Sequence, residues 1–312
     1  MRRYVILLIL VSLFFSFSCQ KLFKKKGPGV VVVTDLTVGK ADSASGNNGV
    51  IYLDLDEHAV ADSFTIPGFS LSTAIYSDYY NGFGYLDFNN VYHITDLKGK
   101  DKISVKLPYH IGLVQPGDNG LLYCIARTGS SDNYFAVFNP ETEEIDLKTE
   151  LGPAAFSLGS SFYDKQDTAY FFIMEGQAKT SEYVGIDPNS GAIKYRYSLD
   201  NGFFSNVTYD PTTGNAVGFY VDTSGNIFLS RFDPTTGQIL SKVESEVKFV
   251  SACKRSFDTD RGYYIAVSEI NVNGTPEGMR NAIVFLSLET GQIADTMLLD
   301  YRILQLVYKP KE

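Results

Sequence analysis

The side chains that could carry chemistry in this sequence are few and scattered. Histidine occurs three times, at His58, His93 and His110, and these positions are too far apart to give the closely spaced ligands of a zinc site. No Gly-x-Ser-x-Gly sequence is present, so the chain lacks the nucleophile elbow of many serine hydrolases. We therefore predict no catalytic residue, no metal site and no cofactor.

Acidic residues suggest two further sites, and both fit poorly. The segment Asp54-Leu55-Asp56-Glu57 has carboxylates for calcium, but it lacks the glycine and the terminal glutamate of an EF-hand loop. Repeated Asp-x-x-Thr-Gly segments resemble those of quinoprotein propellers, which bind a quinone. The docking motif of those propellers uses tryptophan, and because this chain has no tryptophan, quinone binding is disfavoured. The net charge of −9 disfavours phosphate backbones, so nucleic acid is not an expected partner.

The first residues predict export. Met1-Arg2-Arg3 is a basic start, and the apolar run from Tyr4 to Phe17 is shorter than the roughly 20 residues that span a bilayer. The run ends in Ser16-Phe17-Ser18-Cys19, which resembles the lipobox of bacterial lipoproteins. Ser16 and Phe17 depart from that pattern, where leucine and a small residue are usual, and a plain cleaved signal or an uncleaved anchor are the alternatives.

The resemblance implies that Cys19 becomes the first mature residue and carries acyl chains, palmitate among them. It divides the chain into a signal peptide (1–18), a lipidated tether (19–29) and a folded domain (30–312). Gln20 after the cysteine, by resemblance to lipoprotein sorting, implies the outer membrane. The following lysines, in place of the acidic residues common in surface-exported lipoproteins, favour the periplasmic leaflet of the cell envelope.

A repeated turn runs through the rest of the chain. Four segments share an apolar strand end, a turn and an apolar strand start: Phe138 to Ile145, Ile186 to Ile193, Phe232 to Ile239 and Leu286 to Ile293. In this turn Asp bonds the backbone two residues on, Pro presets φ, and Gly accepts a positive φ. The spacing of about 40–55 residues is that of propeller blades. A second turn series, such as Asp210-Pro211-Thr212-Thr213-Gly214, gives each unit four short strands.

These repeats resemble six-bladed propeller lipoproteins with TolB-like or YVTN-type repeats. Five complete units run near 71–107, 110–151, 157–199, 205–244 and 250–298. Val30 to Ile66 supplies three more strands, and Arg302 to Tyr308 supplies one. We therefore predict an all-β fold, a six-bladed β-propeller of four-stranded antiparallel blades, with the N- and C-terminal strands in one blade; a seven-bladed ring is the alternative.

The predicted ring places the two core cysteines in different blades and gives the propeller two different faces. Cys124 and Cys253 fall in opposite blades, too far apart for a disulfide, so two free thiols are expected in the core. The regular turns share one face, and the irregular connections share the other, where binding sites usually lie. The candidate ligand-binding residues stand at the entrances on that irregular face: Tyr109, His110, Asn201, Phe203, Phe204, Asn206, Tyr301 and Arg302.

A rigid scaffold without a catalytic set favours a binding protein over an enzyme. We expect a membrane-anchored propeller that binds or scaffolds a protein or a glycan of the cell envelope. The alternative is a metal-assisted hydrolase or lactonase, since lactonase-like propellers share the expected fold and hold a divalent ion at the channel mouth. Asn206 is the only inner-strand start with a suitable side chain for that ion.

Overall fold

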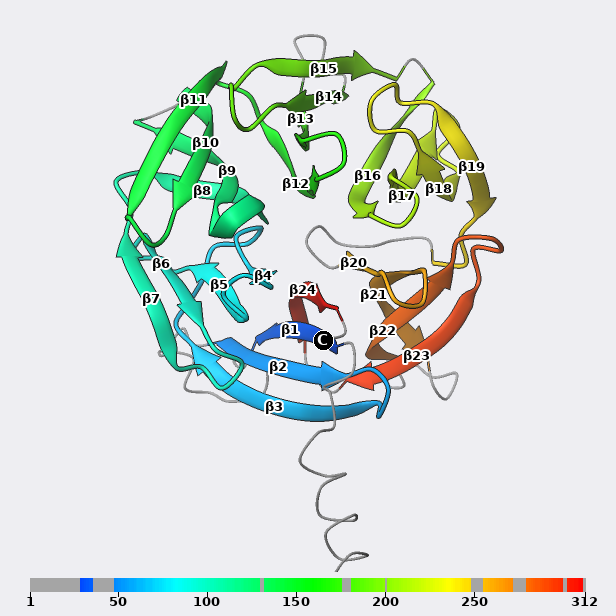
Figure 1. Cartoon of the computed structure of the whole chain (residues 1–312). Coiled ribbons are helices and arrows are strands. Elements are labelled where there is room, and N and C mark those ends of the chain that lie inside the picture. Colours follow the sequence, from blue (N-terminus) through cyan, green and yellow to red (C-terminus); the bar gives the residue numbers. More distant parts are fainter. Residues whose placement is uncertain are drawn as a thin grey trace, which may run out of the picture.

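The computed structural model describes residues 29–35, 48–129, 132–175, 181–199, 201–247, 255–271, 279–299 and 302–310. Within these ranges, 24 strands form six sheets of four antiparallel strands. The sheets surround a central channel as the blades of a propeller (Figure 1). The predicted six-bladed fold is confirmed, and the seven-bladed alternative is wrong.

Blade one joins the two ends of the described chain. From the channel outward its strands are β24 (Arg302–Lys309), β1 (Gly29–Asp35), β2 (Asn48–Asp54) and β3 (Ala59–Ile66). β1 pairs antiparallel with β24, and Gly29 lies opposite Lys309. The ring thus closes through backbone hydrogen bonds between its first and last strands, as the sequence predicted.

Each of the other blades uses four consecutive strands, and the first of them lines the channel. Blade two contains β4 (Ile75–Ser77), β5 (Gly82–Leu86), β6 (Val91–Thr95) and β7 (Asp101–Lys106). Blade three contains β8 (His110–Pro116), β9 (Leu122–Thr128), β10 (Asp132–Asn139) and β11 (Glu144–Gly152). Blade four contains β12 (Phe156–Asp164), β13 (Ala169–Glu175), β14 (Ser181–Ile186) and β15 (Ile193–Ser198).

The last two blades follow the same order. Blade five contains β16 (Gly202–Asp210), β17 (Asn215–Asp222), β18 (Ile227–Phe232) and β19 (Ile239–Glu244). Blade six contains β20 (Arg255–Asp258), β21 (Tyr263–Asn271), β22 (Met279–Ser287) and β23 (Ile293–Leu299). A short 3-10 turn, η2 (Asp118–Gly120), joins β8 to β9. No helix within the described ranges has the length and hydrophobicity to cross a bilayer.

The core lies between the blades. The described residues contain six apolar clusters, each made of side chains from two neighbouring blades. Phe204, for example, packs at a centroid distance of 3.8 Å on Phe232 and edge-on against Tyr183 of blade four. Because strand side chains alternate between the two sheet faces, each blade can bury both faces against its neighbours. Ring closure is therefore needed to complete the clusters on both sides of blade one.

Cys124 lies in the core on β9. It is a free thiol with no exposed surface, and burial raises its pKa to about 12. The predicted free thiol is confirmed at this position. Cys253 lies outside the described residues, as do Cys19 and the predicted signal peptide.

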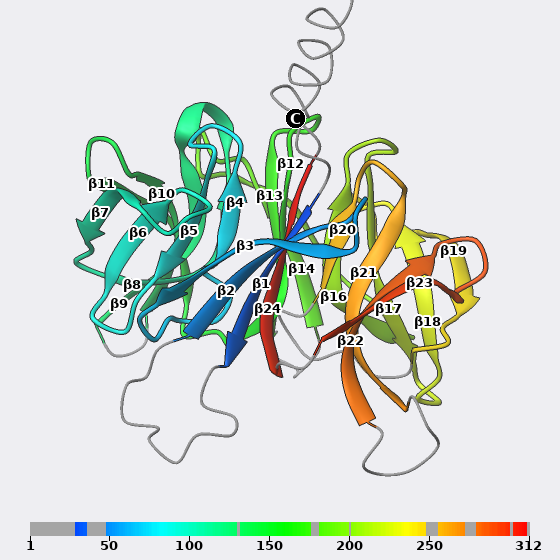
Figure 2. The same cartoon turned by 90° about the horizontal axis from the view of Figure 1, so that it is seen from below.

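The turns divide the propeller into two faces (Figure 2). We call the face with the turns between the first and second and the third and fourth strands of each blade the turn face; the opposite face is the loop face. The β14–β15 turn shows the predicted chemistry, since Asp187 Oδ1 accepts the Asn189 N–H at 2.9 Å and Gly191 adopts a φ of +77°. Hydrogen bonds from the Asn189 backbone and from Ser190 lower the pKa of Asp187. Gly29 and Lys309 lie at the turn face, because neighbouring Tyr308 contacts the β20–β21 turn.

Tyrosine hydroxyls form hydrogen bonds across several seams, the contacts between neighbouring blades, at the turn face. Each of these tyrosines is the next-to-last residue of the first strand of a blade and donates to an aspartate that begins a turn of the preceding blade. The pairs are Tyr163 to Asp118 at 2.6 Å, Tyr209 to Asp164 at 2.6 Å and Tyr308 to Asp258 at 2.9 Å. Burial and the neighbouring Asp164 raise the pKa of Tyr209, so it stays a donor at neutral pH.

Loss of one such hydroxyl should weaken the ring measurably. We expect Tyr209→Phe to lower the free energy of unfolding by about 1–2 kcal/mol, because a hydrogen bond to a carboxylate is lost while the stacking on Phe162 is kept. Urea denaturation followed by circular dichroism measures the change. Tyr79→Phe, at a side chain that is 57% exposed, is the matched control and should leave the midpoint unchanged. Equal midpoints for the two variants would contradict this role of the hydroxyl.

Candidate functional site

The centre of the propeller holds two cavities. The channel cavity, of about 170 Å³, is lined by the first strands of the six blades. The mouth pocket, of about 520 Å³, opens on the loop face beside the starts of β8 and β12. Ser72, in the connection from blade one to blade two, lines both cavities. The mouth pocket is therefore next to the channel, where the sequence predicted a binding site.

Three polar side chains of the mouth pocket form one row across blade three. His110 on β8 lies opposite Arg127 on β9, which lies opposite Asn133 on β10. Cross-strand neighbours of this kind share one face of a sheet. Asn133 Nδ2 donates to Gly152 O at 2.9 Å and to Ala154 O at 3.3 Å, which holds the β11–β12 connection in place as a wall of the pocket.

The remaining walls of the mouth pocket are mainly apolar. Leu71, Leu113, Ile125, Pro153 and Phe156 line it. Leu71 is 42% exposed, although aliphatic side chains are usually covered, and Phe88, at a turn on the same face, is 77% exposed. An apolar cavity with a few convergent polar groups is the usual form of a ligand site.

His110 is a neutral hydrogen-bonding group in this pocket. Its Nε2 lies 3.3 Å from Ser70 Oγ. Partial burial and the positive charge of Arg127 lower the pKa of His110. A Ser–His pair resembles the start of a catalytic triad, but a triad needs an acid that stabilises the imidazolium, whereas Arg127 destabilises it. The electrostatics of the pocket therefore suit binding better than general base catalysis.

The lowered pKa of His110 predicts a pH dependence of stability. An unfolded histidine, with a pKa of about 6.5, takes up a proton before folded His110 does, so protonation favours the unfolded chain. We expect the free energy of unfolding to fall as the pH drops below about 6.5, and this component to be absent in His110→Gln. Urea denaturation of both proteins across this pH range measures the difference. Parallel pH profiles would contradict the assignment.

The structure separates the predicted site residues into different environments. His110 lines the mouth pocket, while Tyr109 packs partly buried on the core, and its carbonyl accepts Asn90 Nδ2 at 2.9 Å. Phe203 is 44% exposed at the start of β16, whereas neighbouring Phe204 is buried in the blade four–five cluster.

Asn201 is exposed, and its carbonyl accepts the Tyr220 hydroxyl at 2.6 Å. Asn206 is buried in a bulge of β16 with a φ of +52°, and its carbonyl accepts the Tyr264 hydroxyl at 2.6 Å. Arg302 opens β24 opposite Asp35, and Tyr301 lies outside the described residues. Of the predicted positions that the structure describes, His110 alone lines the mouth pocket and none lines the channel cavity, so they do not form one site.

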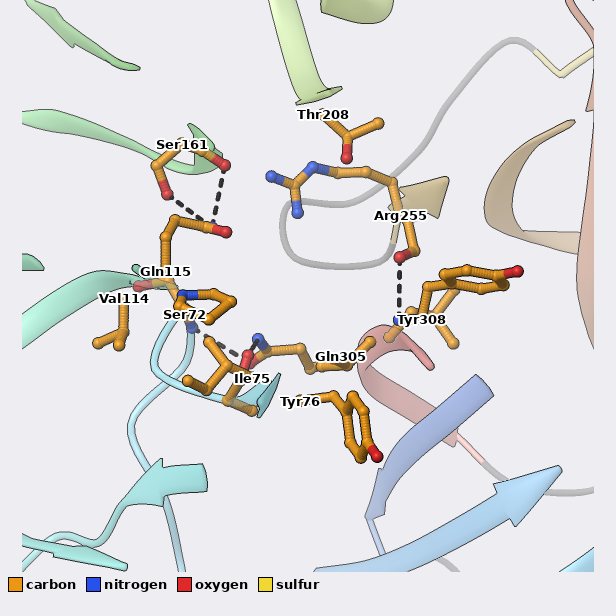
Figure 3. Close-up of a pocket in the computed structure, with 15 residues that line it drawn as sticks. Ser72, Ile75, Tyr76, Val114, Gln115, Ser161, Thr208, Arg255, Gln305 and Tyr308 are labelled. Carbon is orange, nitrogen blue, oxygen red and sulfur yellow. Dashed lines mark hydrogen bonds between the residues drawn. The ribbon is translucent and has the colours of Figure 1, made fainter. Parts of the chain in front are cut away.

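Side chains of the channel cavity fasten the seams between first strands (Figure 3). Gln305 on β24 accepts Ser72 N at 3.2 Å and donates to Ala74 O at 2.8 Å. Gln115 on β8 donates to Ser161 O at 3.0 Å, across the seam between blades three and four. Arg255 on β20 donates to Val207 O through Nε at 3.3 Å and Nη2 at 2.8 Å. Sequence reasoning missed these residues, and no local pattern distinguishes them from other strand polar residues.

The other histidines lie away from both cavities. His93 Nδ1 is 3.0 Å from Ser104 Oγ, and its Nε2 is 3.5 Å from Asp87 Oδ2, on the outer strands of blade two. His58 pairs with Asp295 at 3.0 Å. None of these residues lines the channel cavity or the mouth pocket. Among the described residues, no three His, Cys, Asp or Glu side chains converge in a way that could hold a metal ion.

Comparison with known proteins shows the fold. No protein-family model and no curated protein matches the sequence. Among solved structures, TolB from Acinetobacter baumannii is similar, with a TM-score of 0.65 and 14% identity over 94% of this chain and 70% of that chain. A protein of unknown function from Bacteroides caccae has a TM-score of 0.59 and 12% identity, over 90% of this chain and 98% of that one.

A chain of a nidogen/laminin complex gives the same TM-score, 0.59, with 10% identity over 90% of this chain and 98% of that chain. Identities this low indicate shared architecture and leave the ligand of this chain open. The protein is thus a β-propeller, structurally similar to TolB.

Proposed function

We propose that this protein is a lipid-anchored propeller of the cell envelope that binds a partner at the mouth pocket. The observation that carries the proposal is the pocket itself, an exposed apolar cavity of about 520 Å³ with His110, Arg127 and Asn133 in one row at its edge. This row belongs to the paired strands β8, β9 and β10 of blade three, so a ligand would meet a pre-formed set of polar groups.

A protein segment fits the pocket better than a glycan. The apolar walls and the exposed Leu71 and Phe88 suit aliphatic or aromatic side chains of a partner, which supply most of the binding energy in protein interfaces. Arg127 and Asn133 supply polar groups at the edge of the cavity. A chain of the nidogen/laminin complex is among the similar structures, so a propeller-like chain occurs there in a protein–protein complex.

The position of Gly29 in the fold indicates which face of the propeller the proposed anchor would bring to the membrane. Cys19 precedes Gly29 by ten residues, which can extend over about 35 Å. Because Gly29 lies at the turn face, a tether from Cys19 would bring that face to the membrane and direct the mouth pocket away from it. The proposed location is the periplasmic side of the outer membrane.

Lipidation has a direct test. We expect Cys19→Ser to move the protein from the membrane fraction to the soluble fraction, because the acyl chains supply the anchor. Fractionation of cells, with the mass of the N-terminal peptide of the wild type, measures this. An unmodified peptide, or membrane association that survives the substitution, would contradict the anchor but leave the mouth pocket untouched.

Binding at the mouth pocket is tested by site-specific crosslinking in cells. A photo-crosslinking residue at Leu71, on the pocket wall, should capture a partner protein. The same residue at Leu240, on the outer strand β19 and 49% exposed, is the matched control and should not. The Leu71 product should also disappear when Arg127 is changed to Glu. Equal products at both positions, or none at Leu71, would contradict the site; binding of a purified envelope glycan that Arg127→Glu abolishes would replace the protein by a glycan.

A further inference from the structure

A row of side chains crosses the outer part of blade two and ends at an exposed hydroxyl. Tyr85 on β5, His93 on β6 and Ser104 on β7 lie opposite one another in the sheet. The His93 ring stacks on Tyr85 at a centroid distance of 5.0 Å, and its Nδ1 lies 3.0 Å from Ser104 Oγ. On the other side of the ring, Nε2 lies 3.5 Å from Asp87 Oδ2. Acid, imidazole and hydroxyl thus follow one another as in a Ser–His–Asp triad.

Asp87 determines which nitrogen of His93 can act as a base. The Asp87 side chain is buried, and its Oδ1 accepts the Val91 N–H at 2.7 Å, which leaves Oδ2 for the imidazole. His93 Nε2 is buried and has no hydrogen bond to another group among the described residues. A carboxylate at Nε2 favours the tautomer that carries its proton there. Nδ1 is then the acceptor for the Ser104 O–H, so the two nitrogens exchange their usual triad roles.

The charges around His93 suit a general base. Asp101 Oδ1 lies 3.9 Å from Nδ1, so carboxylates stand on both sides of the ring. Both would stabilise the imidazolium that forms when the serine hydroxyl gives up its proton. His110 in the mouth pocket does not meet this condition, because its charged neighbour is Arg127. The Ser–His pair of blade two therefore has the electrostatics for base catalysis that the pair in the mouth pocket does not have.

Ser104 is open to a substrate. It is exposed on β7, the last strand of its sheet, and no further strand of the described residues pairs with that edge. Leu107 N donates to Asn90 O at 2.9 Å just beyond the two strands. Because hydrogen-bonded and non-hydrogen-bonded pairs alternate, the Ser104–His93 pair, three steps along, is non-hydrogen-bonded, and the Ser104 N–H points away from β6. That N–H lies on the open edge, where it can donate to a carbonyl oxygen held at Oγ.

We propose that Ser104 is a nucleophile for carboxylic esters, with His93 as its general base and Asp87 as the residue that positions His93. Ser104 Oγ attacks the carbonyl carbon while its proton passes to His93 Nδ1. The bond to the alcohol oxygen then breaks, the alcohol leaves with that proton, and the acyl group stays on Ser104. Water hydrolyses this acyl-serine by the same route: it gives a proton to His93, its oxygen joins the acyl carbon, and Ser104 Oγ leaves and takes the proton back. The net reaction converts an ester and water to a carboxylic acid and an alcohol.

This site is separate from the mouth pocket and from the proposed anchor. None of Asp87, His93 and Ser104 lines the mouth pocket or the channel cavity. A small ester is the expected substrate, because an open strand edge offers little surface to bind a larger one. The reaction needs neither a lipid nor a partner protein, so either proposal can fail while the other holds.

Labelling of the mature protein with a fluorophosphonate tests the nucleophile. Such a probe reacts with an activated serine, forms a bond from Oγ to phosphorus and releases fluoride. Peptide mass spectrometry should find the label on Ser104, at a rate at least about a hundredfold above that of Ser241. Ser241 is the matched control, since it is exposed on the outer strand β19 and lies opposite Arg231. No label on Ser104, or equal rates at the two serines, would overturn the proposal.

Substitutions assign the roles of the neighbouring residues. His93→Gln should slow labelling of Ser104 about a hundredfold and remove its decline at acidic pH, because a protonated imidazole cannot accept a proton. Asp87→Asn keeps an acceptor for its turn, and it should slow labelling about tenfold or more and change the pH profile, which a purely structural role would not. His58→Gln removes a histidine that also pairs with an aspartate, Asp295, and it should label like the wild type. Wild-type labelling in His93→Gln, or in Asp87→Asn if the first variant does not fold, would overturn the proposal.

Release of p-nitrophenol from p-nitrophenyl acetate measures the complete reaction. The wild type should release more than one equivalent, and Ser104→Ala should lower the rate about tenfold or more. Ser241→Ala should keep the wild-type rate. Release that stops after one equivalent would overturn the hydrolysis of the acyl-serine, and equal rates for Ser104→Ala and the wild type would overturn the nucleophile.

Discussion

Removal of residues 302–312 is expected to leave the chain without a folded propeller. β24 pairs with β1 along its length, and the buried Ile303 and Leu306 belong to the cluster between blades one and six. Gln305 and Tyr308 bind the neighbouring blades two and six through hydrogen bonds. The truncation would expose the edge of β1 and open apolar clusters on both sides of blade one, which invites aggregation. Size-exclusion chromatography and near-ultraviolet circular dichroism of the tyrosines measure the loss.

Two comparisons make this experiment decisive. Removal of residues 311–312 alone leaves every described strand intact and should give a folded monomer. A synthetic peptide of residues 302–312 added to the truncated chain should restore part of the native signal, because the peptide can pair with the exposed edge of β1. A truncated chain that stays monomeric and cooperatively folded would show that the closure contributes little to stability.

Asp258→Ala is expected to cause the largest effect of a single substitution, a loss of about 3 kcal/mol in the free energy of unfolding. Asp258 has no exposed surface. Its Oδ1 accepts the Asp260 and Arg261 backbone N–H groups and the Tyr308 hydroxyl, and its Oδ2 lies 2.9 Å from Arg261 Nε. Alanine would leave the partly buried guanidinium of Arg261 and the turn amides without their acceptor, and it would remove the hydrogen bond from Tyr308 that joins β24 to blade six. Urea denaturation measures the loss.

Asp222→Ala is the control, because this side chain also accepts two backbone N–H groups of its turn but in a more exposed position. Asp222 Oδ1 accepts the Ser224 and Asn226 N–H groups, each at 2.9 Å. There water can replace the lost acceptor, so the cost should be about 1 kcal/mol or less. If the two substitutions destabilised the protein equally, the contribution of Asp258 would be that of an ordinary turn, and its role at the closing seam would be wrong.

The proposed anchor and the proposed binding site give the faces of the propeller different tasks. The proposed tether brings the turn face, with its tyrosine–aspartate seams, to the membrane. The loop face, with Leu71, Phe88 and the mouth pocket, is then available to a partner in the envelope. The channel cavity lies between the faces and is lined by residues that also hold the blades together.

The fold could be predicted from the sequence because its signals are local. The predicted unit near 205–244, for example, corresponds within a few residues to blade five, which runs from the start of β16 at Gly202 to the end of β19 at Glu244. Turns such as that at Asp187 and Gly191 depend on φ preferences and on hydrogen bonds within four residues. Their repetition at a spacing of about 40–55 residues then predicted the number of blades, and the leftover strands at the two ends predicted the closure.

The sites could not be predicted in the same way, because they depend on contacts between blades. Phe203 and Phe204 are identical residues side by side, yet the first is exposed and the second is in the core. Nothing near Arg255 in the sequence indicates that it reaches Val207 O, 48 residues away. His110 was found because it starts a first strand, but its partner Arg127 is set by the strand register.

The sequence by itself thus determined the all-β class, the repeat, the strand pairing within each blade and the shared first blade, since turn chemistry and period-two patterning act over a few residues. Only the tertiary structure decided which side chains meet at the mouth pocket and in the channel, and which of the predicted residues are buried. Those contacts arise from the packing of one blade on the next, which depends on the shapes and the register of two sheets and leaves no fixed spacing in the chain.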